Sequence, residues 1–172
     1  FTTGAAPDVT APTVSSTVPA AAATGVSLNQ NIAATFSEAM LAGTLTTTTF
    51  TLTGPGATPV AGAVTYTGLT ATFDPTSNLA ASTLFTATIT TGATDLASNA
   101  LAGNYVWTFT TGAAPDVTAP TVSSTAPASA ETAVSLNQNI AATFREAMLA
   151  GTITTTTLTL TGPGATPVAG AV

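Results

Sequence analysis

The stretch FTTGAAPDVTAPTVSST occupies residues 1–17 and recurs without change at residues 109–125. The offset is 108 residues, and laying residues 1–64 over residues 109–172 leaves 57 of 64 positions identical. Solenoids repeat every 20 to 50 residues or so, whereas a compact domain with its own core needs about 100. The period of 108 residues therefore predicts a tandem array with one domain per period.

The phase of this period divides the chain into four expected parts. Residues 1–11 are the tail of a preceding repeat and its linker, residues 12–111 a complete domain, residues 112–120 a linker, and residues 121–172 the incomplete N-terminal half of the next domain. Because residues 121–172 have no counterpart of residues 65–108, we expect the chain to be a segment of a longer array. A domain that borrows strands from another chain is the alternative.

Within the complete repeat, apolar and polar residues alternate with a period of two, which is typical of half-buried strands. Seven strands are expected, at residues 13–19, 31–36, 50–52, 60–66, 69–73, 84–90 and 105–110. Prolines place the first of them on a sheet edge. Only residues 37–43 and 77–82 could be helical, for a turn or two at most.

Seven short strands in about 100 residues are typical of an Ig-like β-sandwich. The expected fold class is therefore all-β, an Ig-like β-sandwich of about seven strands repeated in tandem with a 108-residue period. The abundant threonines suit the solvent-facing sides of the strands. The large side chains expected to carry the core are Trp107, Phe36, Phe73, Phe85, Phe109 and Tyr66.

Three motifs resemble those of the bacterial Ig-like repeat first associated with S-layer and large surface proteins. They are TFSEAM at residues 35–40, TDLASNAL at 94–101 and WTFTT at 107–111, in that order and spacing. The resemblance covers residues 12–111 and the opening half of the next copy. It implies a β-sandwich used in tandem in secreted or cell-surface bacterial proteins, and it implies no catalytic activity.

The motifs depart from the family pattern at a few positions. Ala39 stands where the family usually has proline, Ser98 where it favours glycine, and Phe85 where tyrosine is common. The second copy has Arg145 in place of Ser37. None of these changes alters the expected fold.

The composition excludes many kinds of active site. Threonine and alanine supply 42 and 36 of the 172 residues, and there is no Lys, His or Cys. Thiolate and imidazole catalysis, zinc sites built on Cys or His, disulfides and P-loops are therefore excluded. A net charge of −6 argues against nucleic acid as a partner. No apolar run is long enough for a transmembrane helix, and no signal peptide opens the chain.

Sparse carboxylates are the only candidates for a metal site. Asp95 and Asn99 flank a loop before the last strand, where the simplest interpretation is an Asx-type turn. The alternative is calcium at a domain junction, with Asp95 joined by Asp116 or Asp8 and by Glu146 or Glu38. The chain has no DxDxDG run, so no cofactor and no metal ligand is assigned from the sequence.

Other chemical interpretations are weaker. A glycosidase would need a second carboxylate beside Glu38, and only Asp74 and Asp95 are available within the repeat. Glu131 and Arg145 occur only in the second copy, where an ion pair is an alternative to chance divergence. Ice binding by Thr-x-Thr patterns does not suit the long period, and O-glycosylation of threonines stays open.

The leading function hypothesis is a structural segment of a long extracellular bacterial fibre, stalk, adhesin or surface layer. Its expected partners are neighbouring repeats of the same chain, with lateral self-association into a filament as a further possibility. The Pro-containing linker at residues 112–121 predicts a semi-rigid, extended spacer. The alternatives are a binding module for glycans or host proteins, and a spacer attached to a secreted enzyme.

Overall fold

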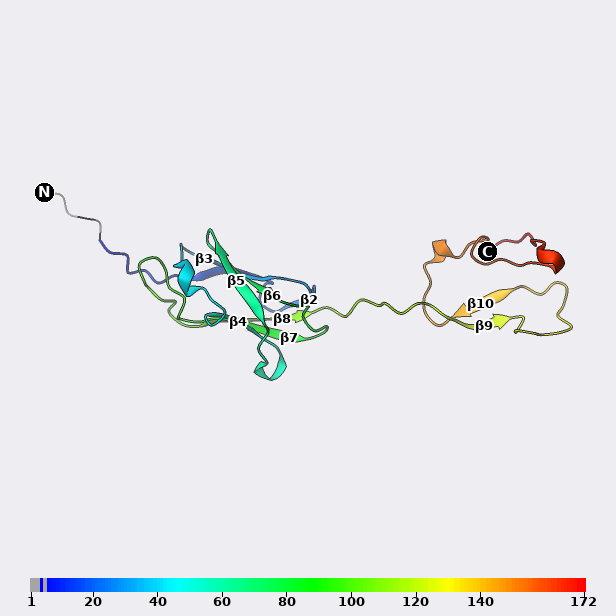
Figure 1. Ribbon diagram of the computed structural model, residues 1–172, viewed down its shortest axis with the longest axis horizontal. Coiled ribbons are helices and arrows are strands. Elements are labelled where there is room, and N and C mark those ends of the chain that lie inside the picture. The colour runs from blue at the N-terminus through cyan, green and yellow to red at the C-terminus, as the bar shows by residue number, and fades with distance from the viewer. Residues whose placement is uncertain (1–3, 5) are drawn as a thin grey trace. The chain divides into compact units, whose positions relative to one another are not determined.

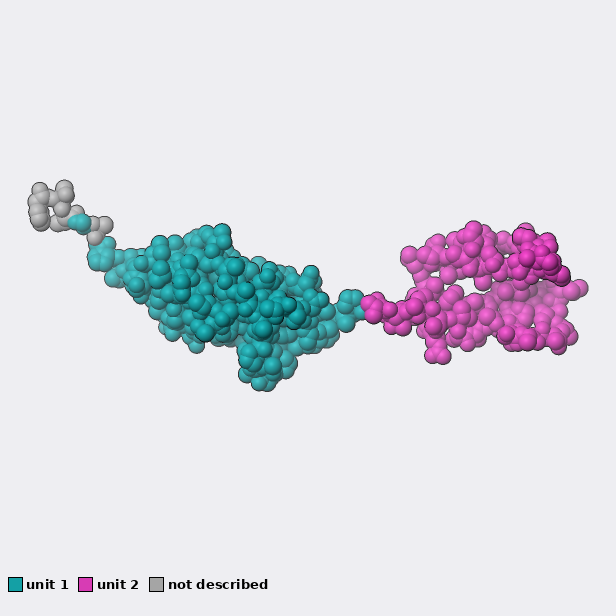
Figure 2. Space-filling view, viewed as in Figure 1, with its two compact units in different colours: residues 1–115 teal, residues 116–172 magenta. Residues whose placement is uncertain are grey.

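A computed structural model describes residue 4 and residues 6–172. These residues fall into two compact units, unit 1 up to residue 115 and unit 2 over residues 116–172 (Figure 2). The division lies within the linker expected at residues 112–120. In the part of the chain that the structure describes, no helix is long and apolar enough to cross a membrane.

Unit 1 is a sandwich of two four-stranded sheets, and this confirms the predicted fold class (Figure 1). One sheet has the order β1 (Val14–Val18), β3 (Ile32–Phe36), β6 (Thr70–Pro75), β5 (Gly62–Thr67). The other has the order β2 (Ala23–Val26), β8 (Tyr105–Thr111), β7 (Leu84–Ile89), β4 (Phe50–Thr53). β1 lies at a sheet edge, as its prolines predicted.

Unit 1 contains one strand more than the seven expected. The additional strand, β2, runs parallel to β8 and places Ala23 opposite Phe109. Its sequence, ATGV, shows no alternation, and Gly25 within it has a φ of 66°. The strand therefore depends on its partner β8 rather than on a local pattern.

Neither stretch expected as potentially helical forms an α-helix. The short helices of unit 1 are 3-10 turns, η1 (Ala42–Thr44) and η2 (Pro55–Ala57). Residues 77–82 form bends and turns instead. Leu79 and Leu101 lie in such irregular segments and are nonetheless 5% exposed, so these segments add to the core.

The core lies between the two sheets. Five of the six large side chains predicted for it are buried, and the sixth, Tyr66, is half-buried. Phe50 joins the two sheets, since its ring centroid lies 5.8 Å from that of Phe73 on β6. The Tyr66 hydroxyl accepts a hydrogen bond of 2.8 Å from the backbone N–H of Met40, which is itself buried. The bond gives the backbone N–H of Met40 a partner, which it needs because folding buries it away from water.

Most strand threonines lie on the outward faces, as predicted, while Thr111 at the end of β8 is buried. Thr35 on β3 and Thr70 on β6 stand opposite each other, with their hydroxyl oxygens 3.0 Å apart. On the other sheet, Thr51 pairs with Thr88 across β4 and β7. The inner faces of the same strands carry the apolar side chains.

Unit 2 repeats only part of this structure. β9 (Val122–Ala126) and β10 (Ala141–Phe144) pair in the register of β1 and β3, and the turns η3 (Ala150–Thr152) and η4 (Pro163–Ala165) match η1 and η2. No residue of unit 2 is buried. The expectation that residues 121–172 form half of a domain is consistent with this exposure.

Candidate functional site

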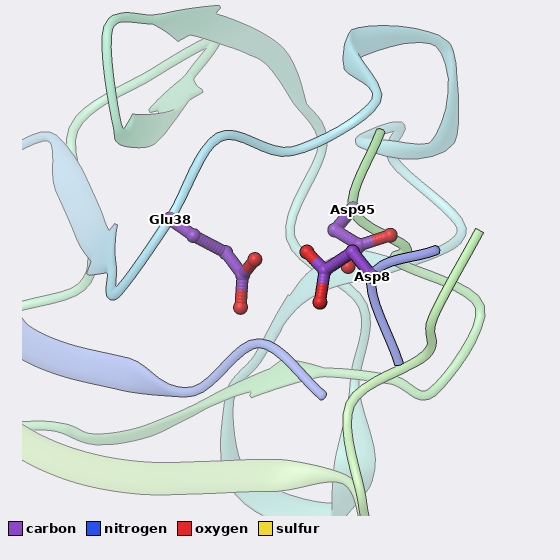
Figure 3. A group of neighbouring side chains, drawn as sticks. All are labelled: Asp8, Glu38 and Asp95. Atoms are coloured by element: carbon purple, nitrogen blue, oxygen red, sulfur yellow. The ribbon is translucent and has the colours of Figure 1, made fainter. Parts of the chain in front are cut away.

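Three carboxylates converge at one end of unit 1 (Figure 3). Asp8 lies in the segment before β1, Glu38 directly after β3, and Asp95 in the loop between β7 and β8. One carboxylate oxygen from each lies within 4.8 Å of those of the other two. These are three of the five acidic residues named as candidate calcium ligands from the sequence.

Backbone contacts hold the Asp95 loop against the segment that carries Glu38. Met40 and Asp95 form an isolated antiparallel bridge, and the N–H of Leu41 donates to the carbonyl of Thr94 at 2.8 Å. Residues far apart in the sequence are thereby placed side by side. The sequence offered Glu38 and Glu146 as alternative partners of Asp95, and these backbone contacts bring Glu38 to it.

The Asp95 loop is the Asx-type turn predicted from the sequence. One carboxylate oxygen of Asp95 accepts hydrogen bonds from the backbone N–H groups of Ala97 and Asn99, both at 2.8 Å. The other accepts from the Asn99 side-chain amide, also at 2.8 Å. Asp95 is only 1% exposed, so these bonds are what makes its burial tolerable.

Asp8 is held by a smaller turn of its own. Its carboxylate accepts a hydrogen bond of 2.9 Å from the N–H of Thr10, and its carbonyl accepts one of 3.3 Å from the Asn99 side chain. Asn99 therefore contacts both aspartates. This bond fastens the segment before β1 onto the loop before β8.

The pKa values of Glu38 and Asp95 are shifted in opposite directions. Partial burial, followed by the negative charges of Asp8 and Asp95, raises the pKa of Glu38 above its ordinary value. Burial alone would raise the pKa of Asp95 too, but hydrogen bonds from Asn99, Ala97 and Ser98 together outweigh it and lower that pKa.

These shifts give opposite pH dependences. The Asp95 contribution to stability is present above its unfolded pKa and is lost as the pH falls through its lowered, folded pKa. For Glu38 the sign is reversed, because its protonated form is favoured in the fold. Its contribution is complete below the unfolded pKa and disappears as the pH rises through the folded one.

The carboxylates line an open hollow of about 330 Å³, together with Ala39, Leu96 and Ala97. Their oxygens are hard ligands of the kind that Ca²⁺ prefers. A glycosidase pair is a poor fit, because Asp95 is buried and its carboxylate is already engaged in three hydrogen bonds. Such a carboxylate cannot reach a sugar carbon to attack it.

The remaining candidates lie elsewhere. Asp74 is exposed on β6, opposite Ala63, and does not join the cluster. Asp116 and Glu146 belong to unit 2, where Asp116 accepts a hydrogen bond of 2.9 Å from Thr118. Hydrogen bonds from Thr118 lower the pKa of Asp116 against the effect of burial, and the Glu146 side chain lowers it further.

The two charged residues specific to the second copy do not pair within the described ranges, residue 4 and residues 6–172. The Glu131 carboxylate instead accepts a hydrogen bond of 2.7 Å from the N–H of Ala128. Arg145 is exposed on the segment after β10. The suggested ion pair between them is therefore not formed in this structure.

Calcium binding at the cluster stays a prediction, and thermal unfolding of the chain tests it. We expect calcium to raise the midpoint of unit 1, because a cation offsets the repulsion among Asp8, Glu38 and Asp95. The Glu38→Gln variant should unfold at a higher temperature than the parent chain without metal, because one of the three negative charges is removed. The same variant should lose most of the response to calcium.

Glu146→Gln is the matched control, because it makes the same substitution at the equivalent position of unit 2. It should leave both the metal-free midpoint of unit 1 and its calcium response unchanged. Identical unfolding curves for the parent chain with calcium and with a chelator would show that the cluster binds no calcium.

A family model described as "Bacterial Ig-like domain" matches residues 8–111 and 116–172. No curated protein sequence matches the chain. Among solved structures, domains 1–6 of the surface layer protein SbsC align at 21% identity with a TM-score of 0.48, over 66% of this chain and 15% of that one. CopC from Methylosinus trichosporium OB3b aligns at 10% identity with a TM-score of 0.47, over 62% of this chain and 99% of that one. The chain thus spans about 15% of the SbsC structure.

Proposed function

Because the chain belongs to the bacterial Ig-like domain family, we propose that it is a structural segment of an extracellular bacterial surface protein, acting as a spacer in a fibre, stalk or adhesin. The observation that carries this proposal is the repetition of 57 of 64 residues at a spacing of 108. In unit 1, residues of a single period build a complete core. Adding such periods lengthens a protein without adding new chemistry.

The composition of the linker supports a role in setting the distance between successive domains. Its prolines, Pro115 and Pro120, restrict the backbone and favour extended geometry in the residues before them. Gly112 at its start donates a hydrogen bond of 2.8 Å to the carbonyl of Val26, which ties the linker to unit 1. A spacer of this kind keeps successive domains apart more firmly than a Gly/Ser-rich linker would.

The proposed partners are neighbouring repeats of the same chain, with lateral association between chains as an extension. Four strands of unit 1 end its two sheets, β1 and β5 in one and β2 and β4 in the other. Exposed edges offer unpaired backbone groups to a neighbour. The low charge density of the chain, with 5% charged residues, weakens the repulsion that would oppose such contacts.

A glycan-binding module is less well supported. Sugar-binding surfaces commonly present an exposed aromatic ring. Among the residues that the structure describes, every aromatic side chain is buried or half-buried, including Tyr66 and Tyr105. The described loops of unit 1 thus present no exposed aromatic ring on which a sugar could stack.

Small-angle X-ray scattering on chains of two, three and four complete repeats tests the spacer role. We expect the maximum dimension to grow by a constant increment with each added repeat, because an extended linker holds successive sandwiches apart. A maximum dimension that stays nearly constant as repeats are added would contradict the proposal.

Variants of the linker provide the control. Replacing Pro115 and Pro120 with glycine should broaden the distribution of interdomain distances. Replacing Ala113 and Ala114 with glycine adds the same number of glycines and keeps the prolines, so it should broaden that distribution less.

A further inference from the structure

The four strands at the sheet edges of unit 1 are not equally open to a further strand. β1 carries a bulge between Val14 and Ser16, which disturbs its hydrogen-bonding pattern. β2 has Gly25 at a φ of 66° and pairs with β8 in an irregular register. The outer edge of β4 is partly occupied, because the carbonyl of Leu52 accepts a hydrogen bond of 2.9 Å from the N–H of Val60. Each of these three edges is therefore protected against pairing with another chain.

β5 has none of these protections among the residues that the structure describes. It pairs with β6 along its whole length without a bulge, and it ends its sheet (Figure 1). Residues 60–73, which include all of β5 and most of β6, contain no charged residue and no proline. Charges, prolines and bulges are the devices that keep natural sheet edges from pairing. β5 is therefore the most open edge of unit 1.

The register of β5 shows which of its backbone groups face outward. The N–H of Thr76 donates a hydrogen bond of 3.0 Å to the carbonyl of Ala61, and opposed residues of an antiparallel pair alternate between bonded and non-bonded positions. Odd-numbered residues of β5 therefore bond to β6, and even-numbered residues direct their N–H and C=O groups to the open side. Pro75, which has no N–H, stands opposite Gly62, as a non-bonded position allows. The outward residues are Gly62, Val64 and Tyr66.

We propose that β5 pairs antiparallel with β5 of a second copy of the chain, about a two-fold axis at Val64. This register places all three outward residues in hydrogen-bonded pairs, Val64 with Val64 and Gly62 with Tyr66, and a shift by two residues in either direction loses one pair. The two four-stranded sheets then form one continuous sheet. The inference rests on the lateral association included in the proposed function and names the surface that carries it.

A second copy of the chain fits this edge because the edge is self-complementary. It carries no charge that would select an oppositely charged partner or repel a copy of itself, and the nearest acidic group, Asp74, lies on β6 opposite Ala63. Pairing about a two-fold axis uses the same surface of both copies. Residues 170–172 repeat residues 62–64, so a second array offers the start of this edge again after one period. Repeated contacts of this kind strengthen one another.

Cysteine cross-linking of the full 172-residue chain tests the pairing, because the parent chain contains no cysteine. Ala63→Cys chains are mixed with Thr65→Cys chains under mild oxidation at about 100 µM, where weak contacts are populated. In the proposed register these two positions face each other with Cα atoms about 4.5 Å apart, within the range of a disulfide.

We expect this mixed disulfide to form at least about tenfold more than the one between Ser16→Cys and Thr65→Cys chains, because β1 does not pair with β5. Ser16 is the matched control position, since it is exposed on another edge strand. The mixed disulfide should also exceed the same-site disulfides, whose Cα atoms are diagonal neighbours about 7–8 Å apart. Intact mass distinguishes the three products.

Two substitutions at Val64 test the role of the outward backbone groups. Val64→Pro, made in both chains, removes the N–H at the two-fold axis without removing a bond to β6, so the mixed disulfide should fall by at least about fivefold. Val64→Ala shortens the side chain but keeps the N–H, and it should cross-link like the parent pair. Circular dichroism shows whether both variants are folded.

Amide hydrogen exchange of the parent chain gives a measurement that needs no substitution. Between about 5 and 500 µM chain, exchange at Val64 and Tyr66 should slow by at least about twofold, because pairing protects the outward amides. Exchange at Thr65 should change less, since its amide already bonds to β6. Exchange at Val64 and Tyr66 that is independent of concentration would contradict the pairing.

Three cross-linking results would overturn the proposal. They are equal yields from the Ala63→Cys and Ser16→Cys mixtures, same-site disulfides as abundant as the mixed one, and an undiminished yield in folded Val64→Pro. The scattering experiment separates this inference from the spacer role. A constant increment per repeat without cross-linking at β5 would refute the pairing alone, and cross-linking without a constant increment would refute the spacer role alone.

Discussion

Replacing Trp107 with alanine should lower the free energy of unfolding of unit 1 by about 3–5 kcal/mol, the range for truncating a buried tryptophan. Trp107 is 3% exposed and lies at the centre of β8. Its ring centroid lies 5.9 Å from that of Phe50 and 5.7 Å from that of Tyr105. No disulfide supports the fold, since the chain has no cysteine. A loss of this size is a large fraction of the stability of a single domain.

Urea or thermal unfolding of the parent and variant chains measures this loss, and Trp107→Phe is the matched control. The indole Nε1–H of Trp107 is buried and has no hydrogen-bond partner among the residues that the structure describes. Phenylalanine removes that unpaired donor while keeping most of the apolar ring, so it should cost less than about half as much as alanine. Equal losses for the two variants would show that the packing of this ring contributes little to stability.

The two copies of the repeat show why sequence predicts the sandwich but not every strand. Phe50–Thr53 forms β4 in unit 1, while residues 158–161 form no strand although three of the four residues are the same. β4 is paired with β7, and residues 116–172 contain no counterpart of β7. Alternation identifies residues able to form a strand, and a partner strand decides whether they do so.

The irregular segments set the other limit on prediction. Met40, Leu79 and Leu101 are buried, yet they lie outside the strands that alternation identifies. Their burial follows from the course of the chain between strands, which has no periodic signature. A motif such as TFSEAM marks the position of Met40 but does not reveal what it packs against.

The sequence identified the residues of the candidate site, but it did not identify which of them lie together. The sequence pointed to Asp95 with either of two linker aspartates and either of two glutamates. The structure brings Asp8 and Glu38 to Asp95. That choice depends on contacts between distant segments, such as the hydrogen bond from Asn99 to the carbonyl of Asp8, 91 residues away. No local pattern encodes a contact of that range.

Gly62 is the position where adding a single methyl group should have the largest effect. It opens β5 opposite Pro75, with ordinary strand geometry. A Cβ atom there would lie 2.5 Å from two ring carbons of Phe73 and 2.7 Å from the carbonyl oxygen of Asp74. The ring is fixed in the core, where Phe73 is 1% exposed, and the carbonyl belongs to the backbone of β6.

We therefore expect Gly62→Ala to lower the free energy of unfolding by about 1–3 kcal/mol, the range for overpacking a core. Gly43→Ala is the control, because a Cβ atom at Gly43 meets nothing within 4 Å and its φ is not in the left-handed region. That variant should be neutral or more stable by up to about 1 kcal/mol, through the reduced entropy of the unfolded chain. Chemical denaturation of both variants measures the difference. If Gly62→Ala proved as stable as Gly43→Ala, Phe73 would have room to move, and the packing between β5 and β6 would be looser than the close approach at Gly62 implies.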